Sequence, residues 1–203
     1  MKIDVASQLT YLTENFDVLQ RECKPLWHPL GFSSCLILNN VGKLNLRIHY
    51  WPESERRTKN PDWPIHTHTY HLSSLVLEGT IRDIQYTTTA GEDYSVYSVS
   101  YNDENSEIAK TDRKVSILHT NDISRSKSET YTVERGVFHQ SQVDFGKSAI
   151  TLVALSDFAK DAPLVLGKDM PEERFPYDRA PFDSETFWRA VHAGLSRHLS
   201  GAS

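Results

Sequence analysis

Residues Pro64 to Gly79 read PIHTHTYHLSSLVLEG, and two histidines of this segment, His66 and His68, are separated by a single residue. On an extended chain, alternate side chains point to the same face, so both imidazoles would reach the same point in space. Imidazole nitrogen is a good ligand for divalent iron, nickel, copper and zinc. The pair therefore predicts half of a metal site, although His-x-His also occurs on solvated strands that bind no metal.

Two further features support a metal site. The apolar run Leu72–Leu77 ends in Glu78-Gly79, a pattern typical of a buried strand followed by a turn. Far downstream, Gly136-Val137-Phe138-His139 places another imidazole beside a glycine turn, within a second strand-rich segment. Because strands that are distant in sequence meet across a β-barrel, His139 is a candidate third ligand.

These segments resemble the two motifs of the cupin superfamily. In the first cupin motif, His-x-His is followed by a glutamate ligand and then by a glycine; here Leu72 occupies the glutamate position. The second motif, Gly-x-x-His, supplies the last ligand. The resemblance implies a mainly β fold, a cupin-type double-stranded β-helix (jelly-roll barrel), to which the apolar periodicity described below adds an N-terminal and a C-terminal helix. It also implies a three-histidine metal site formed by His66, His68 and His139.

Within that superfamily, the chain most resembles the three-histidine thiol dioxygenases of the cysteine dioxygenase type. The similar segments, in chain order, are Gly42–Trp51, Ile65–His68, Gly79–Asp83 and Gly136–His139. This resemblance implies a single Fe(II) as the bound metal, with Ni, Zn or Mn as alternatives. It also implies a small cytoplasmic enzyme of the dioxygenase class.

Three residues that shape the substrate pocket of those enzymes have no counterpart here. The arginine that binds the substrate carboxylate would fall near Ser34, and the cysteine that can cross-link to tyrosine would fall at Leu72 or Ser73. The catalytic tyrosine would fall near Leu155 or Ser156. We therefore expect the metal cage to be kept and the substrate pocket to differ, so that cysteine itself is not the expected substrate.

Two other side chains are candidates for the catalytic machinery. Arg47 shares one face of a predicted strand with His49. If that face looks into the barrel, Arg47 could bind a substrate carboxylate; if it looks outward, Arg47 is a solvated residue, which is the commoner placement of arginine and the one we favour. Tyr70 shares the face of the histidine pair and could donate a hydrogen bond to a metal-bound ligand or simply pack. His71 would face away from the pair, which favours a core or outer-sphere role over ligation.

The remaining pattern is that of strands framed by helices. Apolar residues at three- and four-residue steps predict one helix over Ser7–Glu22, and a second is expected over Ser184–Leu195 with Asp183 or Ser184 as N-cap. Strands are expected over 35–38, 44–51, 72–77, 80–86, 94–101, 114–119 and 148–155, with turns at 87–93 and 102–107. Residues 128–143 are expected to form a hairpin that carries His139, and the interval between the two motifs is long enough for an added hairpin at the substrate entrance.

The charged loop 52–63 leads directly into the metal segment, and it could act as a lid closed by Trp63 or serve as a solvated connector. With 203 residues, the chain is expected to form a single domain. Within it, residues 1–30 would be an N-terminal helical segment, 31–157 the barrel, and 158–203 a wrapping tail with the C-terminal helix.

Composition excludes several classes of function. The formal net charge is −5, and no run of lysine and arginine marks a nucleic-acid surface. No apolar segment approaches the length of a membrane span, and the N-terminus lacks a signal-peptide core, so a cytoplasmic location without membrane contact is expected. The two cysteines match no metal or redox motif.

Three neutral histidines leave a divalent metal with about three open positions, enough for a small-molecule substrate plus dioxygen. The sequence therefore predicts a mononuclear non-haem Fe(II) oxygenase, with a thiol as the substrate that the resemblance implies. The first alternative is a cupin isomerase, lyase or hydrolase that uses its metal without redox chemistry. The second is a cupin that binds a small molecule without turnover. A monomer or a homodimer is compatible with the sequence.

Overall fold

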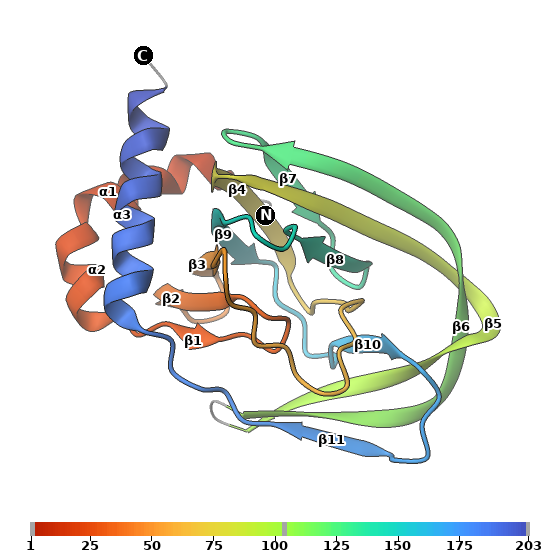
Figure 1. The fold of residues 1–203 in the computed structure, drawn as a ribbon. Coiled ribbons are helices and arrows are strands. Elements are labelled where there is room, and N and C mark those ends of the chain that lie inside the picture. Colours follow the sequence, from red (N-terminus) through yellow and green to blue (C-terminus); the bar gives the residue numbers. More distant parts are fainter. Residues whose placement is uncertain (1–2, 103–104, 202–203) are drawn as a thin grey trace.

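The strands of the chain form two antiparallel sheets, which the computed structural model describes over residues 3–102 and 105–201 (Figure 1). The larger sheet has six strands in the order β1 (Leu26–Trp27), β2 (Ser33–Asn40), β3 (Leu44–Trp51), β9 (Ala149–Ser156), β4 (His71–Glu78) and β7 (Thr130–Val133). The smaller sheet has five strands: β10 (Leu164–Gly167), β5 (Thr80–Asn102), β6 (Asn105–Ser126) and β11 (Arg174–Tyr177) in that order, with β8 (Phe138–Gln142) also paired to β5. The predicted mainly β fold with a helix at each end of the chain is confirmed.

The added hairpin between the two motifs is present, and it is longer than the sequence suggested. β5 has 23 residues and β6 has 22, and they pair from Thr80 with Ser126 to Asn102 with Asn105. The predicted turn at 87–93 is wrong, because pairing continues through a register shift between Ala90 and Tyr94. The polar run there forms an irregularity inside one long hairpin. Of the predicted turn at 102–107, residues 103 and 104 lie outside the described part of the chain.

The N-terminal helical region is divided rather than continuous. It consists of a 3₁₀ turn (Ala6–Gln8), α1 (Leu9–Glu14) and α2 (Phe16–Glu22), with the break at Asn15. The side-chain amide of Asn15 donates to the carbonyl of Tyr11 at 2.8 Å, so it competes with the regular helical hydrogen bonds. The prediction of one helix over Ser7–Glu22 is therefore wrong in its continuity.

The C-terminal helix α3 (Ser184–Ser200) is capped by Asp183, whose carboxylate accepts from the backbone N–H of Thr186 at 2.8 Å. The predicted cap is confirmed, and the helix continues beyond the predicted end at Leu195. Across residues 3–102 and 105–201, none of the helices combines the length and the apolar character that crossing a bilayer requires.

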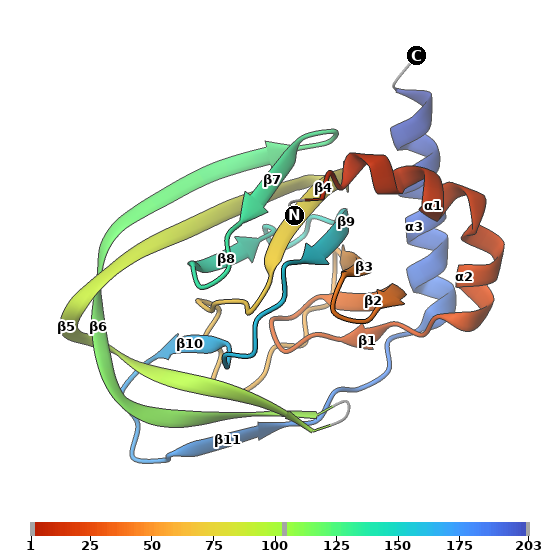
Figure 2. The same cartoon turned by 180° about the vertical axis from the view of Figure 1, so that it is seen from behind.

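The main core lies between the six-stranded sheet and the helices, which cover the side of the sheet away from the β5–β6 hairpin (Figure 2). Alternation along the strands determines which residues enter this core. On β3, Leu46 and Ile48 are fully buried against the helix layer, so the side chain of Arg47 between them faces the interior enclosed by the two sheets. Other members of the core are Leu12, Leu19, Leu77, Leu152, Phe187 and Trp188.

The predicted hairpin over residues 128–143 is wrong, because its two strands belong to different sheets. β7 pairs with β4, whereas β8 pairs with β5. The chain passes from one sheet to the other through a turn at Gly136, whose φ of +77° is readily adopted by glycine alone. This crossing places His139 between the two sheets.

The segment after residue 157 is more regular than a wrapping tail. Two of its short stretches, β10 and β11, add to the edges of the β5–β6 hairpin. The tail therefore forms part of the wall around the interior.

Candidate metal centre

The segment Ile65–His68 lies between the start of β8 and β10, and its hydrogen bonds alternate between them. His66 exchanges two backbone hydrogen bonds with His139, of 3.0 and 2.8 Å. On the other side, the backbone N–H of Thr67 donates to the carbonyl of Leu164 at 2.8 Å, and the hydroxyl of Thr67 accepts from the N–H of Leu164 at 2.9 Å. The segment is thus extended, as predicted, although it precedes β4 instead of belonging to it.

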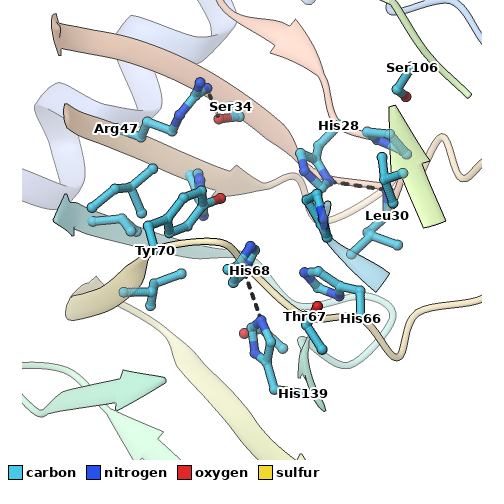
Figure 3. A pocket seen from close by; sticks show the side chains of 18 of the residues that line it. His28, Leu30, Ser34, Arg47, His66, Thr67, His68, Tyr70, Ser106 and His139 are labelled. Carbon is cyan, nitrogen blue, oxygen red and sulfur yellow. Dashed lines mark hydrogen bonds between the residues drawn. The ribbon is translucent and has the colours of Figure 1, made fainter. Parts of the chain in front are cut away.

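The three predicted histidines converge. Their ligand atoms lie within 4.8 Å of one another, and the imidazoles turn toward a common point (Figure 3). Ring centroids are 4.6 to 4.8 Å apart in all three pairs. The Nε2 atoms of His68 and His139 are 2.9 Å apart. Two backbone segments that are distant in sequence therefore deliver His66, His68 and His139 to one place.

Burial keeps the three imidazoles neutral. It lowers the pKa of His66 to about 4, and it lowers the pKa values of His68 and His139 well below the ordinary range of histidine. Nδ1 of His66 donates to the carbonyl of Pro64 at 2.8 Å, since a carbonyl can only accept. Nε2 of His66 is consequently left with a free lone pair. Among the described residues, Nδ1 of His139 is buried and has no hydrogen-bond partner.

The donor set fits a divalent transition metal. Three neutral nitrogen ligands and no carboxylate suit iron(II), nickel and zinc. Two nitrogens bound to one ion at about 2.1 Å and a right angle lie about 3 Å apart, close to the separation of the two Nε2 atoms. Two lone pairs held this close repel each other unless a proton or a cation lies between them. His66, His68 and His139 are therefore the residues that would hold a metal here.

The histidines border a cavity of about 380 Å³ between the two sheets. Its apolar wall includes the buried aromatic residues Phe32, Trp51 and Trp63. Trp63 lies at 4.5 Å from Tyr97 between ring centroids and packs over Gly167. The loop 52–63 thus contributes to the wall through Trp63 and also through Lys59.

Arg47 and Tyr70 both line this cavity. The favoured outward placement of Arg47 is wrong, because the apolar neighbours of Arg47 on β3 face the helix layer and leave Arg47 on the cavity face. Its guanidinium donates to the hydroxyl of Ser34 at 3.3 Å. Tyr70 stacks on His68 with ring centroids 4.6 Å apart, and burial raises the pKa of its hydroxyl.

His71 takes no part in the histidine cluster. It is 2% exposed, does not line the cavity, and its Nδ1 lies 3.1 Å from a carboxylate oxygen of Glu134. The expectation that His71 faces away from the pair is confirmed.

Several cavity residues were not predicted as site residues. Arg179 reaches the cavity from the segment between β11 and α3, and His28 reaches it from the turn after β1. No local pattern marks either residue, because each is brought to the cavity by long-range packing alone. Burial also lowers the pKa of His49 to about 3 and that of Lys59 to about 8.

Comparison with known proteins gives similarity at the level of solved structures. No protein-family model matches the sequence, and no curated protein matches it. Hydroxypropylphosphonic acid epoxidase from S. wedmorenis is 14% identical with a TM-score of 0.40, over 68% of this chain and 56% of the epoxidase. An RmlC-like cupin from Shewanella frigidimarina is 13% identical with a TM-score of 0.37, over 69% of this chain and 87% of the cupin.

Oxalate decarboxylase from Lactobacillus farciminis is 11% identical with a TM-score of 0.39, over 67% of this chain and 32% of the decarboxylase. The chain therefore spans about half of the epoxidase and a third of the decarboxylase. At these identities and TM-scores, no function transfers from the three proteins to this chain. The chemistry has to be inferred from the site itself.

Proposed function

We propose that the protein is a mononuclear non-haem Fe(II) oxygenase that acts on a small molecule bound at the three-histidine site. The convergence of His66, His68 and His139 beside a cavity between the two sheets carries this proposal. The donor set suits several divalent metals, and the resemblance of the sequence motifs to three-histidine thiol dioxygenases favours iron. A thiol is accordingly the first substrate class to test.

The residues of the chain have distinct roles in this proposal. The imidazoles are neutral at physiological pH, so they can bind a metal without first losing protons. The hydroxyl of Tyr70 stays protonated and can donate a hydrogen bond to a substrate beside His68. The aromatic wall formed by Phe32, Trp51 and Trp63 limits the access of water. Bound iron would supply a centre where dioxygen oxidises the substrate, with both oxygen atoms entering the product so that no separate reductant is needed.

The test combines metal analysis with oxygen consumption. Protein purified without added metal is analysed for iron, nickel, zinc and manganese, and the iron-loaded form is then assayed with small thiols and the matching alcohols. We expect oxygen uptake that depends on a thiol and disappears in His66→Ala, His68→Ala and His139→Ala together with the iron. Full activity in any of these three variants would contradict the proposal.

A second candidate is a metal-dependent lyase, isomerase or hydrolase without redox chemistry. The observation in its favour is Lys59, which lines the cavity and whose pKa is lowered by burial to about 8. Such an amine exchanges protons readily near neutral pH, as these reactions require. Turnover without oxygen uptake that is lost in Lys59→Met would favour this candidate over the oxygenase.

A further inference from the structure

The wall of the cavity contributed by β3 and the C-terminal tail is strongly cationic. Arg47 extends from β3 and Arg179 from the segment before α3, and both line the same cavity. In Figure 3, Arg47 lies beyond Tyr70 as seen from His139, so Arg47 and the histidine cluster occupy different parts of the cavity. Two elements that are far apart in sequence thus bring a guanidinium each to one wall.

Among the residues that the structure describes, no acidic side chain neutralises either guanidinium. Within residues 3–102 and 105–201, no carboxylate forms an ion pair with Arg47 or Arg179. The hydrogen bond that fixes Arg47 goes to the uncharged hydroxyl of Ser34. Nε of Arg179 is buried without any hydrogen-bond partner among the described residues. By contrast, Arg197 on the surface holds Glu78 through two nitrogens.

The rest of the cavity does not compensate for these charges. Its described lining contains no aspartate and no glutamate, and Lys59 adds a third basic group. Burial and the positive charge of Arg47 both lower the pKa of Arg179, in line with the placement of the two guanidiniums on one cavity. An uncompensated charge that is partly buried is costly, so a cavity of this kind favours an anionic ligand.

Neutral hydrogen-bond donors line the cavity together with the two cations. The hydroxyls of Ser34, Tyr70 and Tyr101 all line the same cavity. Burial raises the pKa of Tyr70, which keeps its hydroxyl protonated as a donor, whereas Tyr101 lies at the exposed side of the cavity. Planar guanidinium groups match the paired oxygens of carboxylate and phosphate groups, and an oxyanion can accept several hydrogen bonds at once.

We propose that the substrate carries a dianionic oxyacid group, such as a phosphate or phosphonate, that is clamped between Arg47 and Arg179 while the rest of the molecule extends toward the three histidines. Two uncompensated positive charges are balanced by two negative ones, whereas a single carboxylate would leave one guanidinium unpaired. The proposal rests on the proposed function, because it names the substrate class for the same cavity. Arg47 and Arg179 are then the specificity-determining residues.

Binding to the metal-free protein tests this clamp separately from the oxygenase chemistry. The protein is stripped with a chelator and titrated with inorganic phosphate and with acetate at constant ionic strength, well above the second pKa of phosphate. Calorimetry gives the affinity, and the fluorescence of Trp51 and Trp63, which line the cavity, reports on the location of the ligand. We expect phosphate to bind at least about tenfold more tightly than acetate.

Variants assign the binding to the two arginines. Arg47→Gln and Arg179→Gln should each weaken phosphate binding about tenfold or more, and Arg47→Lys should lose less because it keeps the charge. Arg113→Gln, which removes an exposed arginine from β6, is the matched control and should bind phosphate as the unaltered protein does.

Four results would overturn the clamp: no phosphate binding, acetate binding as tightly as phosphate, unchanged affinity in the glutamine variants, or an equal loss in Arg113→Gln. The clamp and the oxygenase can fail independently. Phosphate binding in a protein that takes up no iron and no oxygen would contradict the oxygenase alone. Iron-dependent oxygen uptake without phosphate binding would contradict the clamp alone.

Discussion

At one end of the cavity, three neutral imidazoles converge from two segments that are hydrogen-bonded to each other, whereas at the other end two charged guanidiniums converge from a central strand and the C-terminal tail. The backbone fixes the first group: His66 and His139 pair directly. The two guanidiniums, in contrast, are carried to the cavity by long side chains from separate elements of the fold. The histidine end is therefore preformed for a cation, and the arginine end remains electrostatically incomplete until an anion arrives.

Because the backbone holds the three histidines in fixed positions, we expect metal affinity to fall sharply when a single imidazole is removed. His139→Ala removes one of three ligands and should weaken the binding of Co(II) or Zn(II) by about 100-fold or more, since losing an outer partner of a ligand already costs about 10–100-fold. Competition with a chromophoric chelator measures this affinity. His119→Ala, at an exposed histidine of β6, is the control and should bind metal normally. Equal affinities in the two variants would mean that the imidazoles do not share an ion.

A second prediction concerns the support of the histidine end by β10. In Gly167→Ala, the added methyl group would collide with the ring of Trp63, which is itself packed against Tyr97. We expect a loss of about 1–3 kcal/mol of unfolding free energy in urea, together with weaker metal binding. Adding Trp63→Phe should recover part of both losses by freeing space. If Trp63→Phe instead lowered stability and metal affinity further in the Gly167→Ala background, the collision with Trp63 would not be the cause of the first loss.

A third, smaller loss of stability is expected when the side-chain hydrogen bond between Thr67 and β10 is removed. Thr67→Val removes the buried hydroxyl that accepts from the N–H of Leu164 and leaves that partly buried donor without this partner. The expected cost is about 1 kcal/mol, the lower limit for a lost partner, because the donor is only partly buried and water can reach it. Thr89→Val, at an exposed position of β5, is the control. Identical urea midpoints for the two variants would contradict the role given to this hydrogen bond.

The smallest effect on stability is expected at the arginine end of the cavity. Unlike the preceding substitutions, this one should not destabilise the ligand-free protein. Burial lowers the pKa of Arg179, so folding disfavours its charged form, and Arg179→Gln should leave the stability of the ligand-free protein unchanged or raise it by less than about 1 kcal/mol. Arg197→Gln, which breaks the pair with Glu78, should instead lower stability slightly. Thermal unfolding compares the two. A clear loss in Arg179→Gln would show that this guanidinium is structurally satisfied.

The same contrast explains what the sequence could predict. The histidine end depends on local rules: a period of two places His66 and His68 on one face, and the glycine turn before His139 is visible in the sequence. The cap at Asp183 is equally local. Arg179 follows no such rule, since its arrival at the cavity depends on the path of the whole tail around the β5–β6 hairpin.

Two incorrect predictions have a common physical reason. Residues 87–93 look like a turn because they are polar and contain Gly91, but the partner strand continues alongside them. Residues 128–143 look like a hairpin because two strands flank a glycine turn, but each strand finds a better-placed partner in a different sheet. In both cases, long-range pairing overrides a local turn signal. The local sequence also does not determine the orientation of Arg47. Alternation along the strand defines two faces, but it does not say which of them the helices cover.

The alternating hydrogen bonds of Ile65–His68 have a consequence for changes in chain length. One residue inserted between His66 and His68 would turn one imidazole to the side opposite the other and shift the hydrogen-bond pattern of the segment. The same insertion near Ser54, in the loop ahead of the segment, would leave that phase untouched. The length of the chain can therefore vary upstream of the histidine segment but not between its two histidines.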